Sequence, residues 1–230
     1  MREIVLDTET TDMIPETGDK IVEIGAVELV NHLPTGRALQ LYINPEREVP
    51  AEAVAVHGIT NEFLADKPVF SEVYSEFLEF IGTDSKLVIH NAEFDMKFLN
   101  WELKLVGHKA LPWGNVVDTL GMARRKFPGS PASLDALCRR FEIDNSSRTY
   151  HGALLDCELL AEVYLELLGG RQHGLGLVAN AKADEEAQSA ARRASRKFRE
   201  PRVFEISAEE LAAHSALLEK LKDPLWKQSA

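Results

Sequence analysis

The stretch that decides the fold is Ile4-Val5-Leu6-Asp7-Thr8-Glu9, close to the start of the chain. Its three consecutive apolar residues with high β propensity are typical of a strand that is buried on both faces. Because side chains alternate along a strand, Asp7 and Glu9 point to the same side where the strand ends. Two buried carboxylates repel each other, and no Lys or Arg within the motif compensates them. They are either solvated in a turn or part of a site for a hard divalent cation, which prefers oxygen ligands.

Length and composition are those of one globular domain of moderate size with a tail. The chain has 230 residues, of which 45% are apolar and 27% are charged. No apolar run approaches the roughly 20 residues that span a bilayer, and the Met-Arg-Glu start lacks the apolar region of a signal peptide. Both cysteines, Cys138 and Cys157, lie within apolar helical patterns. We therefore expect a cytoplasmic protein with buried thiols and no membrane partner.

The negative charge is concentrated in the first part of the chain. The net charge is −11, and residues 1–178 hold 28 of the 37 acidic side chains but only 16 of the 26 basic ones. This charge argues against a protein that grips duplex DNA through a broad basic face. It leaves open a site that takes a few nucleotides of a strand end through bound metal ions.

The first 170 residues predict antiparallel strands followed by alternating strands and helices. After the first strand, further strands are expected at 21–30, 39–43, 86–90 and 116–117. Helices are expected at 50–56, 70–81, 93–106, 134–141 and from 152 to the Gly pair at 169–170. This order indicates an α/β domain with helices packed on a mixed sheet.

Two later segments carry further polar residues next to apolar elements. Asp95 lies on the face of its helix that the apolar pattern predicts to be buried, although the helix dipole alone also favours Asp in a first turn. Asn91 is a candidate N-cap of the same helix. Asp156 lies among leucines on the last helix, and His151 would be about 140° away around that helix. We therefore expect His151 in the preceding loop, either as an ordinary surface residue or as a general base.

Three motifs in this order and spacing resemble those of the DEDD exonuclease superfamily, in the subclass whose third motif carries His. They are Asp7-Thr8-Glu9, the segment 91–95 and the segment 151–156. The resemblance spans residues 4–168 and implies a ribonuclease H-like fold, a mixed β-sheet flanked by helices. By this resemblance, four carboxylates hold two Mg²⁺ or Mn²⁺ ions roughly 4 Å apart around the scissile phosphate. These carboxylates are Asp7, Glu9, Asp95 and Asp156.

The same resemblance implies the reaction and the substrate contacts. His151 would take a proton from the attacking water, and the product would be a nucleoside 5′-monophosphate released from a 3′ end. Thr10, His57 and Asn91 would lie near the terminal nucleotide.

After the exonuclease domain at residues 1–170, the sequence predicts a flexible linker at 171–200 and a docking segment at 201–230. Within the linker, residues 172–177 resemble the peptide by which bacterial proteins bind the replicative sliding clamp, a short pattern that also arises by chance. Its expected contacts are Gln172, Leu175 and Leu177. The last segment is too short for a core of its own and should dock on a partner. Ser207 and Glu210 form a capping box that starts a helix in this segment. The expected docking residues on this helix and beside it are Phe204, Leu211, Leu218, Leu221 and Trp226.

Together these parts resemble the proofreading exonuclease subunits of bacterial replicative DNA polymerases. That resemblance implies the polymerase catalytic subunit as the partner of the tail, the sliding clamp as the partner of the linker peptide, and a small accessory subunit as a further candidate. Two alternatives stay open. One is a free-standing 3′ exonuclease that trims RNA, and the other is a scaffold that tethers polymerase to clamp.

Overall fold

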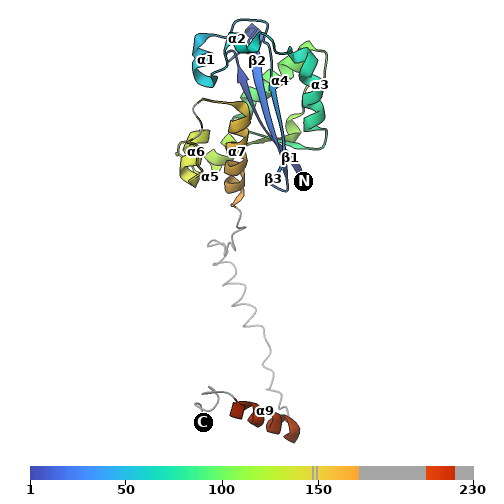
Figure 1. The fold of residues 1–230 in the computed structure, drawn as a ribbon, viewed down its shortest axis with the longest axis vertical. Coiled ribbons are helices and arrows are strands. Elements are labelled where there is room, and N and C mark those ends of the chain that lie inside the picture. The colour runs from blue at the N-terminus through green and yellow to red at the C-terminus, as the bar shows by residue number, and fades with distance from the viewer. Residues whose placement is uncertain (147, 149, 171–205, 221–230) are drawn as a thin grey trace, which may run out of the picture. The chain divides into compact units, whose positions relative to one another are not determined.

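The computed structural model describes residues 1–146, 148, 150–170 and 206–220, and it divides the chain into two compact units, Met1–Leu175 and Gly176–Ala230 (Figure 1). Each unit is considered by itself. The expected clamp peptide lies outside the described residues, as do Phe204, Leu221 and Trp226. The boundaries expected at residues 170 and 200 therefore remain predictions.

The first unit is built on a five-stranded mixed sheet with the strand order β3-β2-β1-β4-β5. The strands are β1 (Arg2–Thr10), β2 (Ile21–Val30), β3 (Leu33–Tyr42), β4 (Lys86–Ile89) and β5 (Val116–Asp118). Strand β1 is central, antiparallel to β2 and parallel to β4. Ile4, Val5 and Leu6 are fully buried, which confirms the prediction for the opening stretch.

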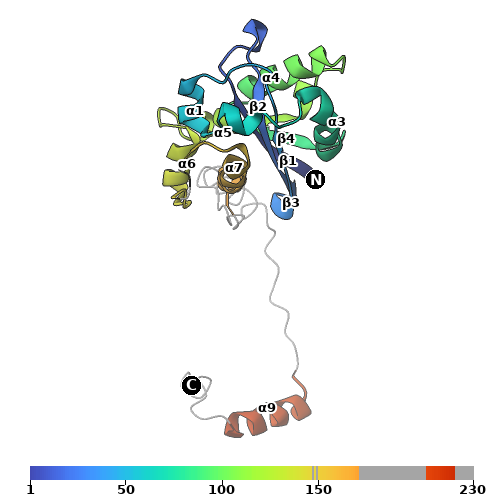
Figure 2. The ribbon, with the colours of Figure 1, turned by 45° about the horizontal axis from the view of Figure 1, so that its top comes forward.

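Helices cover both faces of this sheet (Figures 1 and 2). One face carries α3 (Phe70–Ile81) and α4 (Ala92–Leu105), and the other carries α5 (Thr119–Lys126), α6 (Leu134–Phe141) and α7 (Ala153–Leu168). Two shorter helices, α1 (Ala51–His57) and α2 (Asn61–Leu64), follow β3. Single turns of 3₁₀ helix lie at Pro15–Thr17 and Trp113–Asn115. The predicted α/β fold with helices on a mixed sheet is confirmed.

Alternate residues of β1 divide the core into two halves. Ile4 and Leu6 pack with the side chains of α3 and α4, whereas Val5 packs with those of α5, α6 and α7. Cys138 and Cys157 are free and buried in the second half, as expected. Because every apolar residue of the strand faces one half or the other, β1 is held firmly and its polar end projects beyond the core.

Two local expectations were wrong. Strand β3 begins at Leu33 rather than near residue 39, because its first half is an exposed sheet edge and carries no apolar alternation. Asn91 precedes α4, but its side chain makes no capping bond, and its backbone is left-handed with a φ of 64°. The carboxylate of Asp118 accepts the Asn91 backbone N–H instead, at 3.2 Å.

The second unit contains one described helix, α9 (Ala208–Lys220). Its predicted capping box is confirmed, because the Glu210 N–H donates to the Ser207 hydroxyl and the Ser207 N–H donates to the Glu210 carboxylate. Leu211 and Leu217 are more than half exposed. Among the described helices, none combines the length and the apolar character that a bilayer span needs.

Candidate active site

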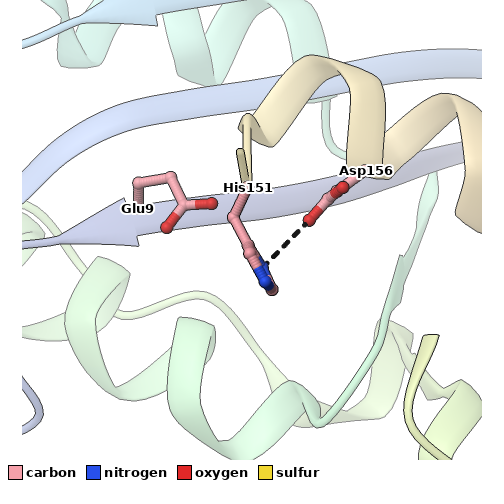
Figure 3. A group of neighbouring side chains, drawn as sticks. All are labelled: Glu9, His151 and Asp156. Carbon is pink, nitrogen blue, oxygen red and sulfur yellow. Dashed lines mark ion pairs between the residues drawn. The ribbon is translucent and has the colours of Figure 1, made fainter. Parts of the chain in front are cut away.

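Three polar side chains from two distant segments meet beside the end of β1 (Figure 3). Glu9 comes from β1, His151 from the loop before α7, and Asp156 from the first turn of α7. One ligand atom of each lies within 4.8 Å of the others, and His151 Nδ1 is 3.6 Å from Asp156 Oδ2. Helix α7 begins at Ala153, so His151 does lie in the preceding loop, as its spacing from Asp156 predicts.

The backbone of β2 brings α7 this close. A Cβ atom at Gly25 would lie 2.3 Å from the carbonyl carbon of Ala153, so the first turn of α7 rests on a position that only glycine allows. The Cys157 thiol lies 3.2 Å from the Gly25 carbonyl oxygen, to which it donates. The buried Glu23 carboxylate accepts the Ala153 N–H at 3.1 Å, which holds the start of the helix. These contacts fix where Asp156 stands relative to Glu9.

Three acidic side chains at this end of β1 have raised pKa values, and burial is the largest cause in each. Burial, followed by the charges of Asp95, Glu9 and Asp156, raises the pKa of Asp7 well above its ordinary value. Burial and the charges of Asp156 and Glu23 raise the pKa of Glu9 to about 8. Burial also raises the pKa of Asp95 to about 7, although the Thr8 hydroxyl donates to this carboxylate at 2.8 Å. The group therefore carries its full negative charge at neutral pH only when cations accompany it.

One cation within the chain does reach this group, and sequence reasoning missed it. The Arg148 guanidinium donates to both oxygens of Asp156, with Nε 2.6 Å from Oδ1 and Nη2 2.5 Å from Oδ2. It also contacts His151 Nδ1 at 2.8 Å and Asp135 at 2.7 Å. Arg148 lies three residues before His151, outside the three motifs, and no local pattern marks it as a partner of Asp156.

The chemistry of these donors fits a divalent cation. Carboxylate oxygens are the ligands that Mg²⁺ and Mn²⁺ prefer, and Glu9 and Asp156 present them to a common space together with an imidazole. Asp7 is linked to this group through the charges of Glu9, Asp95 and Asp156, which raise its pKa, whereas the raised pKa of Asp95 comes from burial. Carboxylates that repel one another in a buried site gain most from a bound cation.

Two cavities flank the acids, and the expected substrate contacts are divided between them. Thr10 and His57 line a cavity of about 480 Å³ beside Glu9. Asn91 lines another of about 490 Å³, together with Asp7 and Asp156. In His57, Nδ1 accepts the Ile59 N–H at 3.0 Å, so a neutral imidazole carries its proton on Nε2. The structure thus brings Thr10 and His57 together but places Asn91 on the other side of the acids.

Comparison with known proteins identifies relatives of this arrangement. The family model RNase_T, described as Exonuclease, matches residues 4–164. A protein of Rickettsia conorii named DNA polymerase III subunit epsilon is 59% identical over 181 residues, which cover 77% of this chain and 78% of that protein. A protein of the same name from Rickettsia prowazekii is 49% identical over 225 residues, or 96% of this chain and 97% of that protein.

Solved structures of similar fold are also nucleases. The structure of Exonuclease X in complex with 5′ overhanging duplex DNA matches with a TM-score of 0.57 and 26% identity, and it covers 79% of this chain and 97% of that one. The fold and the three sequence motifs thus point to the same kind of protein.

Proposed function

The chain belongs to the RNase_T exonuclease family and, within it, to the epsilon subunits of DNA polymerase III, and from this premise we propose that it is the metal-dependent 3′–5′ exonuclease that proofreads for that polymerase. The observation that carries the proposal is the meeting of Glu9, His151 and Asp156 within 4.8 Å, in the field of Asp7 and Asp95. A buried cluster of mutually repelling carboxylates beside an open cavity is costly for the fold, and phosphoryl chemistry with metal ions gives it a use.

The four carboxylates have the role of holding the metal. Asp7, Glu9, Asp95 and Asp156 hold two ions, Mg²⁺ or Mn²⁺, which supply positive charge for the scissile phosphate and for the departing 3′ oxygen. The family likeness supports the number of ions, and the oxygen-rich donor set supports their type.

His151 has the role of the general base. Its side chain is 49% exposed and lies at the mouth of the acid group, so an attacking water reaches it from solvent. A neutral imidazole has a ring nitrogen with a free lone pair, which accepts that proton. Thr10 and His57 hold the terminal nucleotide in the cavity beside Glu9, and Asn91 contacts the strand from the other side. The product is a nucleoside 5′-monophosphate.

The partners follow from the names of the relatives and from the tail sequence. We infer that the chain acts in the cytoplasm on DNA 3′ ends, single-stranded or frayed, as a subunit of DNA polymerase III. The segment 201–230 docks on the alpha catalytic subunit, and residues 172–177 bind the beta sliding clamp. The exposed Leu211 of α9 supports a docking role, because an exposed apolar side chain gains from burial against a partner. A small accessory subunit is a further candidate partner.

The test compares the full chain with a variant that lacks residues 171–230, on 5′-labelled single-stranded DNA and RNA. Both proteins should shorten DNA from its 3′ end in Mg²⁺ and leave it intact in chelator, and only the full chain should bind the alpha subunit and the clamp. Shortening of RNA alone would favour the RNA-trimming alternative. Partner binding without any shortening of DNA would favour the scaffold and refute the proposal.

A further inference from the structure

Arg148 makes contacts that oppose those a catalytic site needs. Its guanidinium is forked around Asp156, with one nitrogen on each carboxylate oxygen. The side chain is only 7% exposed, so water screens this ion pair little. A forked arginine–carboxylate pair is among the stronger polar contacts in proteins, and arginine keeps its charge at all relevant pH values.

The same oxygens of Asp156 are needed by a metal ion. A carboxylate that accepts two charge-assisted hydrogen bonds in its plane has its best lone pairs in use. A divalent ion and the guanidinium therefore compete for Asp156. Each satisfies the buried charge, and the loss of both would leave it uncompensated.

The contact with His151 blocks the general base at the same time. A guanidinium has only N–H donors, so the short Arg148–His151 contact requires that Nδ1 accepts. A neutral imidazole whose Nδ1 accepts carries its proton on Nε2. Neither ring nitrogen is then able to take a proton from water.

Arg148 also has a hydrogen-bond partner outside the group of Asp7, Glu9, Asp95 and Asp156. Its Nη1 donates to Asp135 of α6 at 2.7 Å, and this carboxylate in turn accepts from the Asn145 amide at 3.1 Å. Asp135 is part of the lining of the cavity that also contains Asp7 and Asp156. The arginine therefore has a partner to keep when it leaves Asp156.

We propose that Arg148 is a positioning residue that keeps the site inactive in the absence of metal. Its guanidinium occupies Asp156 and His151 until a divalent ion displaces it, and we call this metal-free state the closed arrangement. The inference rests on the proposed function, because it needs a metal site at Asp156. Arg148 supplies the charge balance that lets the acids fold together, and its release couples metal binding to the freeing of the general base.

The test is calorimetric titration of the full chain with Mn²⁺, without DNA, for wild type and Arg148→Gln. If the closed arrangement holds about 90% of molecules, its removal should tighten Mn²⁺ binding about tenfold. Arg124→Gln is the matched control, because Arg124 is exposed in the same cavity and its loss removes the same charge. The control should change Mn²⁺ affinity by no more than about twofold, since an exposed charge is well screened.

A second Arg148 variant and an NMR measurement test the inference independently of the glutamine variant. Arg148→Lys retains the charge but loses the fork, so it should also tighten Mn²⁺ binding if the glutamine variant fails to fold. Nitrogen NMR of the His151 ring should show Nε2 protonated without metal and a changed protonation pattern in saturating Mg²⁺. Equal Mn²⁺ affinity in wild type and both Arg148 variants would overturn the inference alone. Absence of Mn²⁺ binding in every protein would overturn the proposed function and the inference with it.

Discussion

Carboxylates are buried at both ends of β1, but their neighbours differ. Protein donors surround them at one end, and other carboxylates surround them at the other. At the end that begins the chain, Glu3 accepts the Tyr164 hydroxyl at 2.7 Å, and His32 Nδ1 lies 2.8 Å from its other oxygen. On the neighbouring strand, Glu28 pairs with Arg2 at 2.6 Å and with Arg37 at 3.0 Å. The hydrogen bond from Arg2 is the main cause of the lowered pKa of Glu28.

At the other end, carboxylates face carboxylates. Asp7, Glu9 and Asp95 all have raised pKa values, and the forked arginine contact serves Asp156. The first end shows that this fold can satisfy a buried acid with protein groups alone. The acids at the second end are less completely compensated by protein groups, which is the electrostatic basis of the proposed cation site.

Asp7→Ala should have the largest effect on nuclease activity, because it removes one of the acids that repel one another at the second end of β1. If Asp7 holds metal as proposed, its loss removes several kcal/mol of transition-state stabilisation, so nuclease activity in Mg²⁺ should fall by at least about 1,000-fold. Removal of a repelling acid should leave the melting temperature in chelator equal to that of wild type or higher. Rates on labelled DNA and thermal melts check both effects. Wild-type turnover in this variant would refute the site assignment.

His151→Ala should show whether His151 acts as the general base or as a metal ligand. Loss of a general base costs about 100- to 10,000-fold in rate, whereas the carboxylates proposed to hold the ions remain in this variant. Single-turnover rates should therefore collapse while Mn²⁺ still binds in calorimetry. A variant that lost Mn²⁺ binding to the same degree as its rate would make His151 a ligand instead.

Gly25→Ala should displace the acid end without removing any charged group. The new Cβ would collide with the backbone of Ala153 at 2.3 Å, so α7 and Asp156 must shift. Since a 1 Å misplacement can cost about 100-fold in rate, activity should fall by about that factor. Gly114→Ala is the control, because a Cβ there meets nothing within 4 Å. Equal activity in the two variants would show that the close contact of α7 with Gly25 does not determine the position of Asp156.

Much of the fold and part of this site follow from local sequence patterns. The central strand, the order of strands and helices, and the loop position of His151 were all predicted, because apolar runs and helical spacing are properties of short segments. The convergence of Glu9 and Asp156 was expected only through the family resemblance, since no spacing rule relates residues so far apart.

The parts that escaped prediction depend on packing between elements. The contacts of Arg148 join Asp135 on α6 to Asp156 on α7, and they form only because those helices lie side by side. The start of α7 on β2 depends on Gly25, which in the sequence is one glycine in an apolar run. The true cap of α4 comes from Asp118, which lies 27 residues beyond Asn91. No local pattern contains these relations.

Glu3→Gln should weaken the compensated end and leave the nuclease intact. The amide has one acceptor oxygen, so it can no longer accept from both the Tyr164 hydroxyl and the His32 backbone N–H, and an unsatisfied buried polar group costs about 1–3 kcal/mol. The free energy of unfolding in urea should fall by that amount, while activity per folded molecule stays at the wild-type level. Increased stability would show that Glu3 is as poorly compensated as Glu9.

The last expected effect is a difference in the pH dependence of stability between the two ends. The pKa of Glu9 is about 8 in the folded protein and ordinarily 4.5, so the native state retains a proton that the unfolded chain has lost between these values. This contribution to stability is complete below pH 4.5 and is lost as the pH rises towards 8. In chelator, the unfolding free energy of wild type minus that of Glu9→Gln should therefore decline from pH 5 to pH 8. Solvent screening of this partly exposed group should keep the slope below about 1.4 kcal/mol per pH unit.

Glu28 provides the matched control for that slope. Its pKa is lowered, so its contribution is present above the ordinary value of 4.5 and is lost only in more acidic solution. The corresponding difference for Glu28→Gln should therefore be flat from pH 5 to pH 8. Saturating Mn²⁺ should abolish or reverse the slope at Glu9, because a metal ion favours the ionised carboxylate, and should leave the Glu28 difference unchanged. A flat Glu9 difference in chelator would mean that the two ends of β1 hold their acids in the same way, and the case for a cation site would lose its electrostatic basis.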